Sequence, residues 1–184
     1  MAYPEVSTNA LAVVVIHENA GLTDWVRSFS DQLAEKGFLV IAPDLLSSFD
    51  ETHKKTSDFA TGDAARNAIY RLNPEQVTQD LEAARQFISN DPSSNGKTVI
   101  MGFCWGGAET FRFVTNNSEV LAGLVFYGSS PKTLDEIQKI SAPVYGFYGG
   151  NDQRINATIP ETEEWMKQAG KKFDYLIYPG AGHG

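Results

Sequence analysis

The sequence predicts an α/β fold in which a mostly parallel sheet carries helices on both faces, as a three-layer sandwich. Short apolar runs rich in β-branched residues recur along the 184 residues, and segments with helical spacing separate most of them. Strands that are apolar on both sides need cover on both sides, and right-handed crossovers place helices there. The length is enough for one well-buried domain and the composition is even, so we expect a single domain over residues 1–184.

Six strands are expected from the apolar runs. They lie at Ala12–Ile16, Phe38–Ile41, Thr98–Met101, Leu121–Phe126, Val144–Phe147 and Phe173–Tyr178. In a parallel sheet ligands bind at the carboxyl ends of the strands, so the residues that directly follow each strand are the candidates for chemistry.

A helix is expected between the first two strands, over residues 24–36. Trp25, Phe29, Leu33 and Lys36 recur at intervals of three or four residues, which predicts a helix with one buried face. Gly37 is expected to end the helix in the left-handed conformation.

A second helix is expected over about residues 74–89. Asn73 is its predicted cap and Pro74 occupies the first helical position. The residues predicted to face inward are Val77, Leu81, Ala84 and Ile88. Two further helices should follow Cys104 and span about residues 159–169. The polar segment from 47 to 73 is expected to be a surface excursion with one helical turn, either a lid or a plain loop.

Composition excludes several classes of function. The formal charge of −8 repels phosphate backbones and anionic membrane surfaces, so no nucleic-acid partner and no membrane partner is expected. No apolar run approaches the roughly 20 residues that cross a bilayer, and no secretory leader is visible, so we expect a cytoplasmic protein. One cysteine allows no intramolecular disulfide, and no histidine pair has metal-ligand spacing.

The only cysteine lies in the run Gly102-Phe103-Cys104-Trp105-Gly106-Gly107, between an apolar strand and a helix. In a Gly-x-nucleophile-x-Gly turn the nucleophile has strained backbone geometry, and neighbours without a Cβ let the chain double back. The following helix N-terminus favours a thiolate and a developing oxyanion. Cys104 is therefore a predicted nucleophile; the alternative is a small buried cysteine before helix-capping glycines.

Partners for this nucleophile follow later in the chain. The α/β-hydrolase order is nucleophile, acid, histidine, and the sequence supplies it as Cys104, Asp152 and His183. Asp152 follows the fifth strand on a glycine-flanked loop, and His183 lies between two glycines after the sixth strand. Taken alone, each would be an ordinary loop residue.

The first strand leads into His17-Glu18-Asn19-Ala20-Gly21. The Glu18 carboxylate could accept the thiol proton and so control when the thiolate forms, or it could only cap the next helix. His17 is expected to shape this loop. Aromatic residues near strand ends indicate a small aromatic pocket, although each could equally be core. These residues are Phe103, Trp105, Tyr127 and Tyr148.

These residues together resemble the dienelactone hydrolase family of α/β-hydrolases, in order over nearly the whole chain. The matching motifs are His17-Glu18-Asn19-Ala20-Gly21, Ala42-Pro43-Asp44-Leu45, Asp80-Leu81-Glu82-Ala83-Ala84, Asn95-Gly96-Lys97, Gly102-Phe103-Cys104-Trp105-Gly106-Gly107, Phe126-Tyr127-Gly128, Gly150-Asn151-Asp152 and Gly182-His183. The resemblance implies hydrolysis of dienelactone or another small carboxyl ester or lactone, without metal or organic cofactor.

The resemblance also implies roles for single residues. Cys104 would attack the carbonyl carbon, His183 would be the general base and Asp152 would orient it. Glu18 would pair with the resting thiol. The backbone N–H groups of Trp105 and Asn19 would bind the oxyanion, and Tyr127 would lie in the pocket.

The sequence departs from the family pattern at both ends and in its arginines. Members usually begin with two earlier strands and continue past the histidine with a substrate-binding arginine and a final helix. Arg66 and Arg71 lie near, but not at, the place of another expected arginine. A missing final helix would expose apolar sheet surface, so we expect a homodimer or a marginally stable monomer.

Two other functions stay open at this point. An inactive relative that binds a partner through the exposed sheet face would keep the fold without the chemistry. A redox sensor based on Cys104 is the weaker alternative, because no second cysteine is present to resolve a sulfenic acid.

Overall fold

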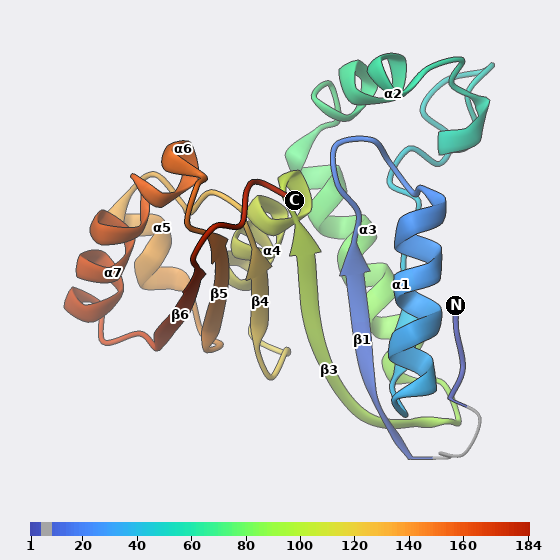
Figure 1. Ribbon diagram of the computed structural model, residues 1–184. Coiled ribbons are helices and arrows are strands. Elements are labelled where there is room, and N and C mark those ends of the chain that lie inside the picture. The colour runs from blue at the N-terminus through green and yellow to red at the C-terminus, as the bar shows by residue number, and fades with distance from the viewer. Residues whose placement is uncertain (5–8) are drawn as a thin grey trace. The chain divides into compact units, whose positions relative to one another are not determined.

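The computed structural model describes residues 1–4 and 9–184 (Figure 1). These divide into two compact units, Met1–Thr98 and Val99–Gly184. The strands follow the order β2-β1-β3-β4-β5-β6 in a six-stranded sheet, and the pairs β1–β2, β3–β4, β4–β5 and β5–β6 are all parallel. The predicted α/β class with a mostly parallel sheet is confirmed. Organisation as a single domain stays a prediction.

The first unit is an α/β arrangement around a short parallel strand pair. Its elements are β1 (Ala10–Ile16), α1 (Asp24–Glu35), β2 (Leu39–Ile41), the 3₁₀ helix η1 (Thr56–Asp58), α2 (Gly62–Ile69) and α3 (Pro74–Ser89). The pair β1–β2 is in parallel register with Val13 opposite Val40. Figure 1 shows α1 on one side of β1 and α3 on the other. This double cover explains why β1 is apolar along its whole length.

Helix α3 forms as its sequence predicts. The Asn73 side chain accepts hydrogen bonds from the backbone N–H groups of Glu75 (2.8 Å) and Gln76 (3.1 Å) and so caps the helix. Its predicted inward side chains are all buried: Val77, Leu81, Ala84 and Ile88.

The buried face of α1 differs from the prediction. The residues in contact with the interior are Val26, Ser30 and Ala34, whereas Trp25 is 50% exposed and stacks on Phe29 with ring centroids 5.5 Å apart. Smaller side chains allow the helix to approach the sheet closely, and the aromatic pair lies at the margin of this contact. The hydroxyl of Ser30 donates to the Val26 carbonyl (2.8 Å), so its burial leaves no donor unpaired.

The excursion over residues 47–73 is more ordered than predicted, since it contains η1 and the two turns of α2. Thr56 joins it to the rest of the first unit. Its N–H and hydroxyl both donate to the Asp44 carboxylate (2.8 and 2.7 Å), and its hydroxyl oxygen accepts from the N–H of Leu22 (2.9 Å). Gly21 makes this contact possible, because a methyl group built there would lie 2.3 Å from the Thr56 hydroxyl oxygen. The excursion is therefore fixed against the loop that follows β1.

The second unit contains the remaining strands and four helices. Its elements are β3 (Ser94–Phe103, which begins in the first unit), α4 (Trp105–Asn116), β4 (Gly123–Phe126), α5 (Leu134–Lys139), β5 (Val144–Gly149), α6 (Gln153–Asn156), α7 (Ile159–Gln168) and β6 (Phe173–Tyr178). Helix α4 packs on β4 at Gly123, where an added methyl group would lie 3.0 Å from Val114. This close packing joins the last turn of α4 to the first residue of β4.

The two faces of β4–β6 differ. One face carries buried residues such as Val125 and Val144. The other carries half-buried rings, with Phe126 and Phe147 stacked at 4.6 Å, and continues to the exposed side chains of Leu176 and Tyr178 on β6. Self-association through this apolar face stays a prediction.

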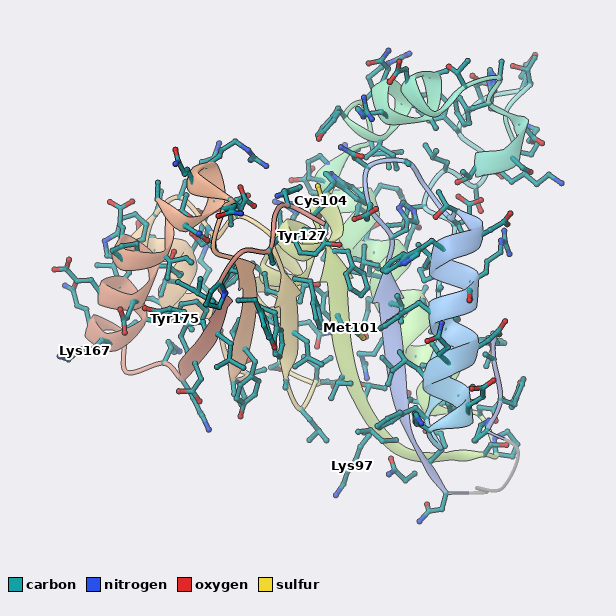
Figure 2. All side chains as sticks on the ribbon, in the orientation of Figure 1. Lys97, Met101, Cys104, Tyr127, Lys167 and Tyr175 are labelled. Atoms are coloured by element: carbon teal, nitrogen blue, oxygen red, sulfur yellow. The ribbon has the colours of Figure 1, made fainter. Side chains whose placement is uncertain are left out.

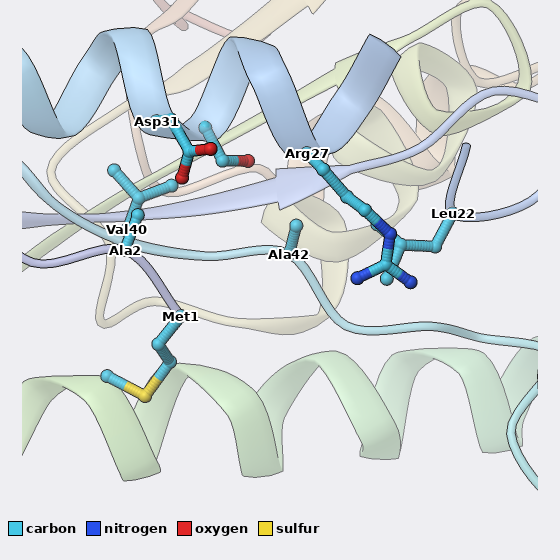
Figure 3. Close-up of a pocket in the computed structure, with 8 residues that line it drawn as sticks. Met1, Ala2, Leu22, Arg27, Asp31, Val40 and Ala42 are labelled. Carbon is cyan, nitrogen blue, oxygen red and sulfur yellow. The ribbon is translucent and has the colours of Figure 1, made fainter. Parts of the chain in front are cut away.

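In the described part of the chain, no helix is both long and apolar enough to cross a membrane. A cavity of about 270 Å³ lies in the first unit between α1 and the strand β2 (Figure 3). Arg27 and Asp31 of α1 supply its charged groups. None of the predicted site residues is among those that line it.

Candidate active site

Cys104 lies on a tight turn between the end of β3 and the first residue of α4. Its backbone has φ of 54°, a value that residues other than glycine seldom adopt. Two sets of hydrogen bonds hold it there. Its N–H donates to the Phe126 carbonyl (3.0 Å), and its own carbonyl accepts from the N–H groups of Gly107 (3.0 Å) and Ala108 (3.2 Å). Neighbouring strand and helix thus impose the unfavourable conformation on the cysteine.

The glycines around Cys104 are required by space. A methyl group on Gly102 would lie 2.1 Å from the carbonyl oxygen of Gly106, and one on Gly107 would lie 2.7 Å from that of Phe126. Gly128, after β4, faces the same crowding, since its added methyl group would lie 2.3 Å from the carbonyl carbon of Gly107. The turn can therefore form only where three backbone segments lack side chains at the point of contact.

The structure brings Cys104, His183 and Asp152 together within the second unit. The Nε2 atom of His183 lies 3.1 Å from Cys104 Sγ, and its Nδ1 atom lies 2.5 Å from Asp152 Oδ2. A carboxylate can only accept, so Nδ1 carries the proton and Nε2 is left facing the sulfur. The imidazole can then take the thiol proton, which leaves a thiolate beside an imidazolium.

Asp152 is held more firmly than its partner histidine. Its side chain is 6% exposed, against 31% for His183. Its second oxygen, Oδ1, accepts from the N–H of Ile155 (3.3 Å) at the start of α6. The carboxylate is thereby fixed by the helix on one side and directed at the imidazole on the other.

Tyr127 lies beside the histidine at the carboxyl end of β4. Figure 2 shows it next to Cys104 at the same end of the second unit's strands. Its ring and the His183 ring lie edge to face, with centroids 5.0 Å apart. The Tyr127 backbone has φ of 40°, and its N–H donates to the Phe147 carbonyl (2.8 Å). Tyr127 also lines a cavity of about 310 Å³ with Phe147 and Tyr178. This cavity borders the glycines on either side of His183.

Phe103 and Tyr148 occupy packed positions. Phe103 is 4% exposed and its ring lies 4.7 Å from that of Phe126. Tyr148 is 3% exposed and packs with Ile155 and Ile159, and this burial raises the pKa of its hydroxyl. Contact of either ring with a substrate stays a prediction.

Glu18 and Asn19 lie in the first unit, in the loop after β1. His17 shapes this loop as predicted, because its Nδ1–H donates to the Glu18 carbonyl (2.8 Å) while its Nε2 accepts from the N–H of Leu45 (3.2 Å). Complete burial lowers the pKa of His17 and keeps the ring neutral. The Asn19 side chain donates to the Tyr70 hydroxyl (3.2 Å). The roles expected for Glu18, and for the N–H groups of Asn19 and Trp105, stay predictions.

A buried carboxyl group lies on α4, close along the chain to the cysteine. Glu109 Oε2 is buried and has no hydrogen-bond partner among the described residues. Burial raises the pKa of Glu109 to about 7, and the charge of Arg112 opposes that rise only in part. Nowhere in residues 1–4 and 9–184 do three His, Cys, Asp or Glu side chains form a group that could hold a metal ion.

Comparison with known proteins shows the family of this chain. The sequence profile of the Dienelactone hydrolase family matches residues 1–184. The chain belongs to the dienelactone hydrolase family. The resemblance expected from the sequence is thereby confirmed.

Individual relatives in the dienelactone hydrolase family are longer than this chain. A Salmonella typhimurium protein provisionally named carboxymethylenebutenolidase is 33% identical over 194 residues, which cover 99% of this chain and 70% of that protein. A protein of the same name from Methylorubrum extorquens is 31% identical over 182 residues, which cover 93% of this chain and 62% of that protein. The chain thus spans under two thirds of the Methylorubrum protein.

A solved structure has the same fold. The crystal structure of a provisionally named dienelactone hydrolase from Klebsiella pneumoniae subsp. pneumoniae superposes with a TM-score of 0.86 at 25% identity. The match covers 99% of this chain and 79% of that one.

Two residues near Cys104 and His183 stand in motifs that the sequence shares with the family, but no role was predicted for them from the sequence. Gly128 completes the steric requirement of the cysteine turn, and its position directly after β4 was the available signal. Asn151 bonds to the loop that carries His183 through both its backbone N–H and its side chain. It lies between a glycine and Asp152 on the loop after β5, where only the aspartate was singled out.

Proposed function

We propose that this chain hydrolyses small carboxyl esters or lactones with Cys104 as nucleophile, His183 as general base and Asp152 as the orienting acid. One observation carries the proposal: a single imidazole lies within hydrogen-bonding distance of both the sulfur and the carboxylate, at 3.1 and 2.5 Å. The names of the longer relatives favour lactones within this class.

The reaction proceeds in two steps. In the first, His183 Nε2 takes the thiol proton, Cys104 Sγ bonds to the carbonyl carbon, and the bond between that carbon and the ester oxygen breaks. The proton on Nε2 passes to the departing alkoxide. With a lactone the alcohol remains attached to the acyl group, so ring opening leaves one acyl chain on the sulfur.

In the second step water frees the acyl group. His183 takes a proton from the water, whose oxygen attacks the thioester carbon, and the C–S bond breaks. The proton returns to the sulfur, so the enzyme is regenerated and the carboxylic acid leaves. Asp152 stabilises the imidazolium formed in each step, because its carboxylate faces Nδ1.

Residues of two loops are proposed to assist. The N–H of Trp105, the first residue of α4, is at a helix N-terminus, where donors favour a developing negative charge. The N–H of Asn19 is proposed as the second donor, and Glu18 as the carboxylate that pairs with the Cys104 thiol at rest. Loss of one oxyanion donor typically costs about 10²–10³ in rate.

Turnover of p-nitrophenyl acetate tests the proposal. Wild type should hydrolyse it, whereas Cys104→Ala and His183→Ala should lose turnover, and intact-mass analysis should show one acetyl group on wild type but none on Cys104→Ala. Equal rates in wild type and both variants would exclude this mechanism. A panel of short acyl esters and lactones then ranks substrates by kcat/KM.

A further inference from the structure

The histidine loop, residues 179–184, carries His183 and has no helix or strand of its own. The loop follows β6, which lies at the edge of the sheet and, among the described residues, pairs with β5 alone. A base on such a segment needs contacts outside the strand to keep its ring in place.

Contacts of this kind come from the loop between β5 and α6. Gly149, the last residue of β5, makes room for them, because a methyl group built there would lie 2.1 Å from the Gly182 carbonyl oxygen. The N–H of Gly150 donates to the Tyr178 carbonyl (2.8 Å), which extends the strand pairing by one bond. Beyond this point Asn151 makes the connection.

Asn151 holds the histidine loop at two consecutive residues. Its backbone N–H donates to the Ala181 carbonyl (2.9 Å), and its side-chain Nδ2 donates to the Gly180 carbonyl (3.1 Å). Asp152, the next residue, bonds to His183 itself. The orienting carboxylate and the anchor of the histidine loop are therefore adjacent in one short segment.

The segment is itself fixed from the helix side. The side chain of Asn156, the last residue of α6, donates to the Gly149 carbonyl (2.8 Å), and Asp152 Oδ1 accepts from α6 at Ile155. The loop between β5 and α6 is thus bonded to α6 on one side and to the histidine loop on the other. In this arrangement the scaffold can fix the position of a catalytic group on the second loop.

We infer that Asn151 is a positioning residue for the general base. It acts through the histidine loop: its side-chain amide fixes the carbonyl of Gly180 and thereby keeps the His183 imidazole in line between Asp152 and Cys104. The inference rests on the proposed function for the role of His183. It assigns to Asn151 no contact with substrate.

The size of the effect follows from the bonds that remain. Replacing the side chain leaves the backbone N–H of Asn151 and the His183–Asp152 bond in place, so the loop is loosened and not lost. One exposed hydrogen bond changes the population of the aligned imidazole by about threefold to tenfold. The rate constant kcat should fall by this factor, while KM for a small ester stays within about twofold, because Asn151 does not contact the substrate.

The experiment compares Asn151→Ala, Asn151→Asp and Asn151→Gln with wild type. Asn151→Asp keeps the shape but cannot donate, whereas Asn151→Gln keeps an amide donor and should regain part of the lost rate. The matched control is Asn116→Ala, since Asn116 is also exposed and its Nδ2 also donates to a backbone carbonyl, that of Arg112 (2.8 Å).

Two readouts separate positioning from stability. The first is kcat and KM, measured at a temperature well below the melting temperature of each variant. The second is the rate of Cys104 alkylation by iodoacetamide from pH 5 to 9, which reports how well the imidazole takes the thiol proton. We expect Asn151→Ala and Asn151→Asp to lose threefold to tenfold in both kcat and alkylation rate near neutral pH, and Asn116→Ala to lose in neither.

Equal kcat and alkylation rates in Asn151→Ala and Asn116→Ala would overturn the inference, as would a loss confined to melting temperature. If Asn151→Ala does not fold, Asn151→Asp and Asn151→Gln provide the same comparison, and equal rates in those two would also overturn it. Failure of the proposed function is a separate result, because it would appear as full activity in Cys104→Ala and His183→Ala.

Discussion

His183 and Cys104 approach each other through Nε2 and Sγ at 3.1 Å, although 79 positions of chain separate them. Each is supplied by the end of a different strand, β6 and β3, and the aspartate by the end of β5. The parallel sheet thus brings three distant sequence positions together at the carboxyl ends of its strands.

Replacing Asp152 by Asn should lower kcat by about 10² to 10⁴. The amide can present its N–H to Nδ1, which favours the wrong tautomer of His183 and leaves an imidazolium without a counter-charge. Steady-state hydrolysis of p-nitrophenyl acetate measures the loss. Asp174→Asn is the control, because Asp174 is an exposed residue of β6 that pairs with Lys172 at 3.5 Å; a similar loss in that variant would argue against a specific role of Asp152.

Replacing Gly128 by Ala should destabilise the protein by about 1–3 kcal/mol and slow the alkylation of Cys104. The added methyl group would lie 2.3 Å from backbone of Gly107, so either the start of α4 or the end of β4 must shift. Thermal unfolding and iodoacetamide reactivity measure the two effects. Gly62→Ala is the matched control, since a methyl group at Gly62 meets nothing within 4 Å. Unchanged melting in Gly128→Ala would contradict the steric account of the turn.

The buried His17 should make stability fall in mild acid. Its folded pKa is lowered by burial, so at pH values below about 6.5 the unfolded chain binds more protons than the folded one. The contribution of His17 to the free energy of unfolding therefore decreases as pH drops below about 6.5 and does not change with pH above that range. Urea unfolding at pH 7.5 and 5.5 measures the difference, which should shrink in His17→Gln and persist in His53→Gln, whose imidazole is partly exposed and bonds to the Asp50 carboxylate. A difference as large in His17→Gln as in wild type would refute the assignment.

The buried Glu109 should act in the opposite direction. Its pKa rises from 4.5 to about 7 on folding, so the folded chain binds more protons between these values and stability falls as pH rises through that window. Glu109→Gln should therefore stabilise the protein by up to roughly 3 kcal/mol at pH 8 and change little at pH 4.5. Denaturant unfolding at the two pH values measures this, with Glu164→Gln on the exposed side of α7 as control. A pH-independent gain would show that packing, and not ionisation, is responsible.

Much of the fold was predictable from local pattern. Asn73 and Pro74 mark the start of α3, and the inward residues of that helix recur at regular spacing, so a short-range rule was enough. The Gly-x-Cys-x-Gly run between a strand and a helix predicted the turn at Cys104, because steric crowding at such a turn leaves few other residue choices. The order of Cys104, Asp152 and His183 indicated which strand ends to compare.

The features that were missed depend on contacts between distant segments. On α1 the large aromatic residues Trp25 and Phe29 suggested the buried face, but the sheet selects the smaller stripe that lets the helix approach. Helix α2 has two turns where one was expected, because Thr56 and Asp44 fix the excursion that carries it. Nothing local in Gly150-Asn151-Asp152 shows that the asparagine meets the carbonyls of residues 180 and 181.

Because β6 is the edge strand of the sheet, it can be undocked while the rest of the sheet is formed. This strand follows every other described strand along the chain, and its pairing with β5 brings His183 to Asp152 and Cys104. During refolding, molecules with every helix formed but the final strand undocked would give a nearly full circular dichroism signal and no turnover. Under the proposed function, an ester assay would report only molecules in which β6 is docked, whereas optical probes of helix content would also report molecules in which it is not.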